Sequence, residues 1–165
     1  MFGYTQLTDL RYREDKGFYY DDFVVGLTIE HRPGRTITTT DNIWQSLISM
    51  NQHPLHIEAE YADKTEFGQL LVSSLVTFNI VNGMTVHSVS QRAIANLGWD
   101  EVRLTAPVFV GDTLYAESEV VDKRLSKSRS GQGVVTVRTC GKKQDGAVAI
   151  SFRRTILVPL RASAR

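Results

Sequence analysis

The spacing of apolar positions changes along the chain, and each spacing predicts a different element. Apolar side chains recur at helical spacing over residues 43–50, directly after Thr40-Asp41, a pair suited to the start of a helix. Residues 68–84 are apolar on most sides and carry no charged side chain, which predicts a long helix that is buried rather than amphipathic. Residues 59–64 predict a further short helical segment.

Strand-like runs dominate the second half of the chain. An alternating run at residues 28–38, interrupted at Pro33-Gly34, adds one more strand. Strands that follow one another through short turns pair antiparallel. The pattern therefore predicts an α+β fold in which an antiparallel sheet of about five strands wraps around one long buried helix. The four runs of the second half are residues 101–104, 113–125, 133–142 and 147–158.

Length and composition narrow the class of protein. The 165 residues suit one domain, which we place at 18–158, with a polar arm at 1–17 and a tail at 159–165. A net charge of +1, from 19 basic and 18 acidic residues, argues against a nucleic-acid partner. No apolar run approaches the roughly 20 residues of a membrane span, and no apolar signal segment opens the sequence. We therefore expect a cytoplasmic protein with no membrane partner. The single cysteine, Cys140, lies in a strand-like run and suits a passive thiol in a reducing compartment.

The segment Met50-Asn51-Gln52-His53-Pro54-Leu55-His56 carries the clearest candidate chemistry. It places two imidazoles and a carboxamide within six residues, and histidine can take and return a proton near neutral pH. The proline favours an extended conformation at the residue before it, so His53 is expected to be extended and His56 to be presented at a defined angle. From spacing alone, a polar loop with two solvated histidines is an equally good interpretation.

This segment resembles the signature of the MaoC family of hydratases and dehydratases, which includes the R-specific enoyl-CoA hydratases. The family pattern is an aspartate, any residue, then Asn-Pro-(Leu/Ile)-His. Here Pro54, Leu55 and His56 match, whereas Asn51 replaces the aspartate and His53 replaces the asparagine. Residues 106–112, Ala-Pro-Val-Phe-Val-Gly-Asp, resemble a second family segment, and the apolar helix is a third point of similarity. The resemblance covers roughly residues 18–158 and implies the hot dog fold.

The resemblance also implies roles for individual residues. His56 corresponds to the histidine that holds and activates water in the family. Asn51 corresponds to the catalytic carboxylate, but a carboxamide cannot accept a proton near neutral pH and could only orient the water. His53 is either a participant in catalysis or a substituted turn residue that caps the loop. The two histidines lack a third ligand at a recognisable spacing, so no metal is expected, and coenzyme A enters only as part of the substrate.

Further candidates lie on the long helix and near the strand ends. Asn82 occupies the position of a serine that related hydratases carry near the catalytic carboxylate, although a hydrogen bond in the core would explain it equally well. Ser73-Ser74 aligns with the pair that supplies the oxyanion hole, so the backbone N–H of Ser74 would bind the thioester oxygen and Ser73 would contact the substrate. Arg124 and Arg129 are candidates for the coenzyme A diphosphate, or else form part of a solvated surface.

These observations predict an acyl-CoA hydratase or dehydratase, a hydro-lyase that adds water reversibly across an α,β double bond. The neutral Asn51 removes a negative charge next to the acyl group, which favours a short, branched dicarboxylic substrate such as mesaconyl-CoA, with methylmalyl-CoA as its hydrated counterpart, or itaconyl-CoA. A hot dog thioesterase is the alternative enzyme, but the long helix lacks the carboxylate that many of these enzymes carry. An inactive acyl-CoA-binding protein is the alternative outside the enzymes. Because the edge of the predicted sheet is open in a monomer, we expect a homodimer or a higher homo-oligomer.

Overall fold

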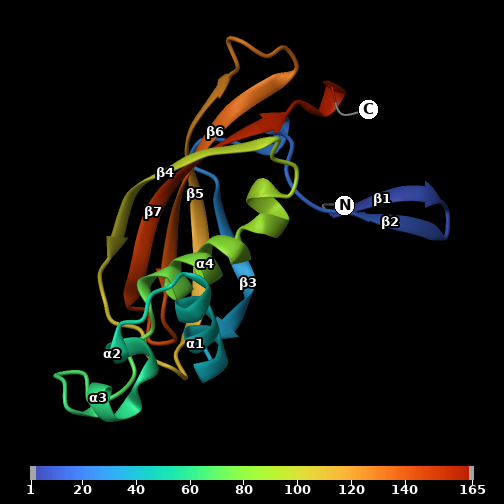
Figure 1. Ribbon diagram of the computed structural model, residues 1–165. Coiled ribbons are helices and arrows are strands. Elements are labelled where there is room, and N and C mark those ends of the chain that lie inside the picture. Colours follow the sequence, from blue (N-terminus) through green and yellow to red (C-terminus); the bar gives the residue numbers. More distant parts are fainter. Residues whose placement is uncertain (1–2, 164–165) are drawn as a thin grey trace.

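The main sheet of the computed structural model, which describes residues 3–163, has five antiparallel strands in the order β3-β5-β6-β7-β4 (Figure 1). Each strand pairs with its neighbours over most of its length, and β4 and β3 form the two edges. The α+β layout with about five antiparallel strands is thus confirmed. The strands are β3 (Thr28–Thr36), β4 (Ala95–Leu104), β5 (Thr113–Leu125), β6 (Gln132–Lys142) and β7 (Val148–Pro159).

The helix α4 (Ser74–Met84) lies across one face of this sheet and contacts β3, β5, β6 and β7. Its Val81 is fully buried against the sheet. A Cβ added at Gly141 of β6 would lie 2.5 Å from a methyl carbon of Val81 and 2.8 Å from one of Ile150. Gly141 therefore lets the helix approach the sheet more closely than any residue with a side chain could.

The long helix is shorter than the sequence predicts, because the segment before it is extended. Leu71 forms an isolated β-bridge with Phe109, and the N–H of Val72 donates to the carbonyl of Val108 at 2.9 Å. These long-range pairings leave Ser73 as the N-cap residue of α4. The helix is also less enclosed than predicted, since it exposes a stripe of residues along one side. The stripe consists of Ser74, Leu75, Asn79 and Gly83.

Three short helices connect β3 to α4. They are α1 (Thr39–Ile48), α2 (Pro54–Ile57) and α3 (Ala59–Asp63); α1 and α3 agree with the predicted helical segments, whereas α2 lies in the segment predicted as a turn. The apolar repeat of α1 faces outward: Trp44 is 66% exposed and Ile48 is 70% exposed. The buried positions of α1 are instead Asn42 and Ser46. None of the helices within residues 3–163 combines the length and the apolarity required to cross a membrane.

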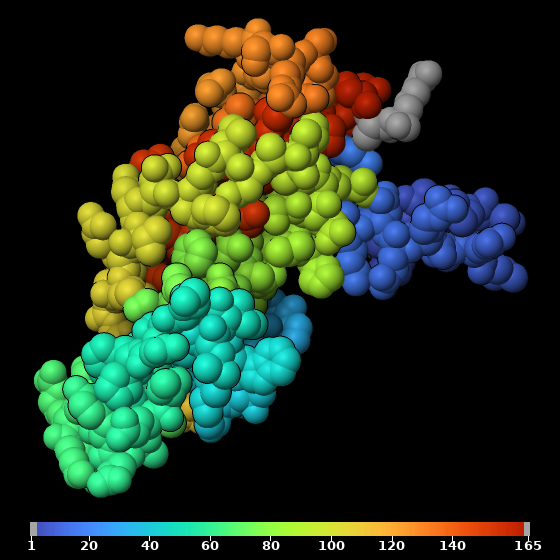
Figure 2. All heavy atoms as spheres, viewed as in Figure 1, coloured from blue at the N-terminus to red at the C-terminus, as the bar shows by residue number. Residues whose placement is uncertain are grey.

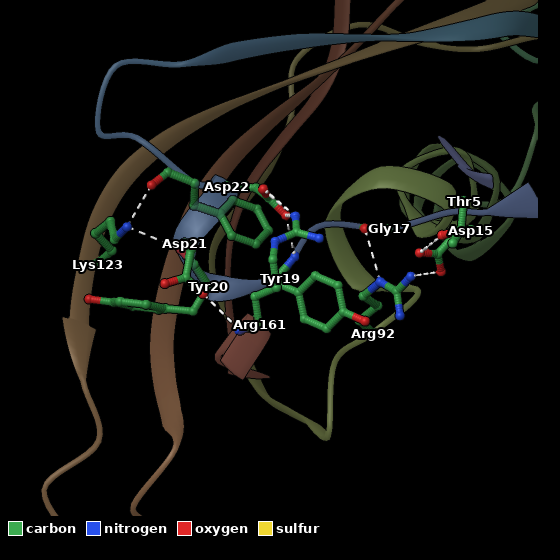
Figure 3. A network of polar contacts seen from close by, with 11 residues as sticks. Thr5, Asp15, Gly17, Tyr19, Tyr20, Asp21, Asp22, Arg92, Lys123 and Arg161 are labelled. Carbon is green, nitrogen blue, oxygen red and sulfur yellow. Dashed lines mark hydrogen bonds and ion pairs between the residues drawn. The ribbon is translucent and has the colours of Figure 1, made fainter. Parts of the chain in front are cut away.

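The arm predicted at residues 1–17 contains a hairpin of β1 (Gly3–Thr8) and β2 (Arg11–Asp15) that projects from the body, while residues 1–2 lie outside the described part (Figure 1). At its base, the guanidinium carbons of Arg92 and Arg161 lie 4.1 and 4.5 Å from the centre of the Tyr19 ring (Figure 3). Arg92 also pairs with Asp15, and Arg161 pairs with Asp22 at 2.6 Å.

The segment expected as a tail is fixed at the same place. Its short helix η3 (Arg161–Ser163) is bound to the neighbouring η1 (Tyr20–Asp22): the backbone N–H of Arg161 donates to Asp21 at 2.8 Å, and the Arg161 guanidinium donates to the Asp22 carboxylate. Residues 164–165 lie outside the described part.

A buried polar chain lies inside the sheet. The Nε2 atom of His31 is 2.9 Å from the hydroxyl of Ser118, which is 2.8 Å from that of Thr139, and the Nδ1 atom of His31 is 3.2 Å from the hydroxyl of Ser88. Burial, together with the nearby charge of Arg32, lowers the pKa of His31 to about 4. The imidazole is therefore neutral at physiological pH.

Candidate active site

The turn between α1 and α2 is built by Asn51 and Pro54. The N–H of Asn51 donates to the carbonyl of Ser46 at 2.9 Å, and its side-chain Oδ1 accepts from the N–H of His53 at 3.3 Å. His53 is extended, with φ −64° and ψ 124°, as the following proline predicts, and Pro54 opens α2. The Nδ2 atom of Asn51 donates to the hydroxyl of Ser73 at 3.4 Å. The turn is thus tied to the start of α4.

His56 is fixed in one tautomer by its surroundings. Its Nδ1 atom lies 2.9 Å from the carbonyl oxygen of Leu71. A carbonyl can only accept, so Nδ1 must carry the hydrogen, which leaves Nε2 of the neutral ring with a free lone pair. The ring is half-buried and its backbone N–H donates to the carbonyl of His53 at 3.0 Å. His56 is therefore oriented as a base that accepts a proton on Nε2.

Asn42 holds the whole arrangement together. Its amide is fully buried and donates to the carbonyls of His56 at 2.9 Å and Leu71 at 3.2 Å, while its Oδ1 accepts the N–H of Ser73 at 2.9 Å. The Asn42 side chain thus positions three parts of the site: His56, the extended segment at Leu71 and the N-cap residue Ser73. Asn42 is not among the residues predicted from the sequence, where its only signal is a polar side chain on the side of the helix away from the outward-facing Trp44.

The start of α4 supplies hydrogen-bond donors next to these residues. The N–H groups of Ser74 and Leu75 belong to the first turn, where no intrahelical acceptor exists, and the helix N-terminus carries partial positive charge. Ser74 also lines a cleft of about 320 Å³. The other residues of the cleft are mostly apolar, and they include Phe67, Leu71, Val72, Pro107 and Val108. An apolar cleft that ends at free N–H donors suits a thioester whose oxygen gains negative charge during a reaction.

His53 has a structural contact at this site. Its Nδ1 atom accepts the N–H of Leu55 at 3.2 Å, so its side chain caps the start of α2. The centres of the His53 and His56 rings are 5.8 Å apart. A catalytic role for His53 stays a prediction.

Three other candidates lie elsewhere in the chain. Asn82 is eight residues after Ser74, about 12 Å along α4, where its Oδ1 accepts the indole N–H of Trp99 at 3.2 Å. Arg124 and Arg129 lie at the far end of β5 and in the turn after it, and the start of that strand is the end nearest the site. About ten strand residues, or roughly 33 Å, separate the two ends. A single chain does not bring these three residues to His56.

Lys143 is a basic side chain that contacts the wall of the cleft. It lies 2.9 Å from the carboxylate of Asp112 and 3.5 Å from the carbonyl of Pro107 in the cleft wall. Burial alone would raise the pKa of Asp112, but hydrogen bonds from Gln144, from the N–H of Phe109 and from Lys143 hold it below its usual value. Lys143 is thus a partly neutralised cation at the cleft. Among residues 3–163, no three His, Cys, Asp or Glu side chains converge as metal ligands would.

Comparison with solved structures identifies the fold. A protein of Mycobacterium tuberculosis described as having a double hotdog fold superposes with a TM-score of 0.82 at 24% identity, over 90% of this chain and 46% of that chain. A MaoC domain dehydratase from Chloroflexus aurantiacus, described as putative in its source, superposes with a TM-score of 0.85 at 32% identity, over 98% of this chain and 44% of that chain. The five-stranded sheet around α4 is therefore a MaoC-like hot dog domain, as the sequence predicts.

The family follows from the sequence comparison. The model of the mesaconyl-CoA hydratase family matches residues 3–165, and the chain belongs to this family. A mesaconyl-CoA hydratase from Cereibacter sphaeroides is 35% identical over 152 residues, which are 92% of this chain and 44% of the relative. The chain thus spans less than half the length of this relative.

Proposed function

We propose that this chain is a hydro-lyase domain that adds water reversibly across the α,β double bond of a CoA thioester. The observation that carries the proposal is the fixed tautomer of His56, whose free Nε2 lies at the turn tied to the start of α4. Membership of the mesaconyl-CoA hydratase family supports the same chemistry.

The reaction would use the chain's own residues in three roles. Nε2 of His56 takes a proton from water while the water oxygen forms a bond to the β-carbon. The electrons of the double bond move towards the thioester oxygen, where the N–H of Ser74 stabilises the enolate. His56 then returns the proton to the α-carbon, so that one water is added and no other reactant is required. Asn51 helps to position the water, because its amide cannot itself take the proton.

The substrate we propose is a short, branched dicarboxylic thioester, with mesaconyl-CoA first and itaconyl-CoA second. Asn51 is uncharged where the MaoC signature has an aspartate. A carboxylate at that position would repel the free carboxylate of the substrate by about 4 kcal/mol at a distance of ~4 Å and an effective dielectric constant of ~20. The neutral amide removes this repulsion.

The biological setting we propose is a homo-oligomer in the cytoplasm. Trp44 and Ile48 of α1 and Leu75 of α4 are exposed apolar side chains of the kind that subunits cover. A single cysteine without a disulfide partner suits a reducing compartment.

The test is a comparison of substrates. The conjugated double bond of an enoyl thioester absorbs in the ultraviolet, and hydration removes this absorbance. We expect kcat/KM to be highest for mesaconyl-CoA and lower for crotonyl-CoA and a medium-chain enoyl-CoA. Preference for either monocarboxylic substrate would contradict the charge argument, and no absorbance change with any of them would contradict hydration itself.

A further inference from the structure

The guanidinium of Arg154 is a buried charge for which residues 3–163 supply no counterion. Arg154 is 7% exposed and its Nε donates to Oδ1 of Asn96 at 2.7 Å, while Nη1 donates to the hydroxyls of Thr85 and Ser90 at 3.2 Å each. All three acceptors are neutral, and no carboxylate among residues 3–163 forms an ion pair with Arg154. A guanidinium keeps its charge in proteins, and a buried charge without a counterion is costly. This arrangement is suited to an anion from outside the chain.

One nitrogen of Arg154 remains available to such an anion. Its Nη2 atom has no hydrogen-bond partner in the part of the chain that the structure describes, and it is not one of the fully enclosed polar atoms. Red atoms of β7 are visible in the hollow between β4, in yellow, and the green helical segment at residues 74–90 (Figure 2). Because Nη2 is not fully enclosed, an anion from outside can reach it.

Asn82 presents a second free donor beside Arg154. Trp99 is the direct partner of Arg154 in the pairing of β4 with β7, so both side chains point to the same face, with the guanidinium carbon 5.7 Å from the ring centre. The indole N–H occupies Oδ1 of Asn82, which leaves Nδ2 without a partner between residues 3 and 163. Thr85 links the two groups, because its hydroxyl accepts from Arg154 and donates to the carbonyl of Asn82 at 2.7 Å. Two donors beside one ring make a receptor for a carboxylate.

We propose that Arg154 and Asn82 bind the free carboxylate of the dicarboxylic acyl group, and that they do so in the active site of a second copy of this chain. The proposal rests on the function proposed above and adds the residues that select the substrate. Within one chain the receptor is too distant. Asn82 is about 12 Å along α4 from the Ser74 amide, whereas a four-carbon acyl chain spans roughly 5 Å.

The exposed stripe of α4 shows how a second copy would bring the receptor to the site. Leu75, Asn79 and Gly83 recur at intervals of four along one side of a helix that has no charged residue. No atom lies within 4 Å of a Cβ built at Gly83, so another backbone can approach it. A two-fold axis at Asn79, the midpoint of α4, pairs two such helices antiparallel and places the end of one beside the start of the other. The partner's Asn82 then lies level with Val76, two residues or about 3 Å along the helix axis from Ser74.

The decisive measurement is the ratio of kcat/KM for mesaconyl-CoA to that for crotonyl-CoA. We expect Arg154→Met to lower this ratio by about 10- to 100-fold, the range for a hydrogen bond to a charged group. Arg153→Met is the matched control, since Arg153 is the neighbouring residue of the same type, points to the opposite face and pairs with Glu101 at 3.3 Å. Its ratio should stay at the wild-type value. Equal losses on both substrates in Arg154→Met would overturn the proposal.

A second variant covers the case in which Arg154→Met does not fold. Asn82→Asp introduces a carboxylate that neutralises Arg154 and occupies the receptor, and it should lower the same ratio. Titration calorimetry with both thioesters measures the binding preference for mesaconyl-CoA over crotonyl-CoA independently of turnover. If no enoyl thioester is hydrated by the wild type, the proposed function fails, whereas an unchanged binding preference in both variants contradicts the receptor alone. Dissociation of the oligomer with an unchanged ratio would mean that a partner's acidic residue fills the site, and would also overturn the proposal.

Complementation tests the assignment to a second copy. His56→Asn and Arg154→Met subunits, co-expressed with different affinity tags, form mixed dimers that can be purified. One of the two sites in a mixed dimer has an intact His56 and an intact partner's Arg154. We expect mixed dimers to hydrate mesaconyl-CoA at up to half of the wild-type rate, well above either variant alone. No gain over the parent variants would show that both residues act within one chain.

Discussion

The carbonyl oxygen of Leu71 accepts a hydrogen bond from Nδ1 of His56, and the N–H of the same Leu71 donates to the carbonyl of Leu55 at 3.1 Å. Leu71 also pairs with Phe109 in a β-bridge. The direction of the imidazole is therefore set by a contact between two segments that are far apart in the sequence, and not by the local turn alone.

The first prediction concerns His56 as the base. His56→Asn keeps a side-chain N–H that can reach the carbonyl of Leu71 but lacks the acceptor at Nε2. We expect kcat to fall by about 10²- to 10⁴-fold, the usual contribution of a general base, with little change in melting temperature. Steady-state kinetics and a thermal melt measure the two effects. Near wild-type turnover in a folded variant would remove His56 from the mechanism.

The second prediction concerns Asn51. Asn51→Ala should lower kcat more than it raises KM, because the role proposed is to orient water in the transition state. Asn51→Asp restores the carboxylate of the MaoC signature, so crotonyl-CoA should become a better substrate and mesaconyl-CoA a worse one. Kinetics on both thioesters provide the measurement. If neither monocarboxylic nor dicarboxylic substrates respond to the aspartate, the charge at this position does not select the substrate.

The third prediction concerns the close packing at Gly141. Gly141→Ala places a methyl group against the buried Val81 and Ile150, and overpacking of this kind costs about 1–3 kcal/mol in the free energy of unfolding. Gly98→Ala is the control, because no atom lies within 4 Å of a Cβ built there. Urea denaturation should show a clear loss for Gly141→Ala and a smaller one for Gly98→Ala. Equal stability of the two variants would mean that α4 can move away from the sheet.

The fourth prediction concerns pH and the buried His31. Its pKa in the folded state is lowered to about 4 by burial and by Arg32, against 6.5 for an ordinary histidine. Between pH 6.5 and 4 the unfolded chain therefore binds a proton that the folded chain does not. The contribution of His31 to the free energy of unfolding is fully present above pH 6.5 and is lost as the pH falls towards 4. The loss should reach about 3 kcal/mol.

Urea denaturation at several pH values between 7 and 4 measures this loss, and His31→Gln should remove it. The lowered pKa values of Asp41 and Asp112 act below pH 3.8 and so leave this interval to His31. A free energy of unfolding that stays constant from pH 7 to 4 would show that the imidazole is not held in its neutral form.

The sequence predicts β5, β6 and β7 closely because turn residues mark their ends, whereas β4 begins at Ala95, six residues before the predicted run at 101–104. β5 occupies residues 113–125 as predicted, and Gly111-Asp112 precedes it. The start of α4 is predicted six residues too early, because Leu71 and Val72 are held extended by Phe109 and Val108, and a local pattern cannot reveal such a distant partner.

Part of the candidate site could likewise be predicted from the sequence, and part could not. His56, Asn51 and Ser73 were found through a short motif and a resemblance, and the structure brings them together. Asn42 was not found, because a buried amide in α1 gains its meaning only from carbonyls contributed by two later segments. Asn82 lies on the predicted helix, yet helical rise alone separates it from Ser74 by about 12 Å.

The stacked group at the base of the hairpin couples the two ends of the chain. Tyr19 lies between a guanidinium that holds the hairpin and one that belongs to the last helix. Loss of either arginine should therefore destabilise both the hairpin and the last helix. Amide protons of β1 and of η3 should exchange with solvent as one unit, although more than 150 positions separate them in the sequence.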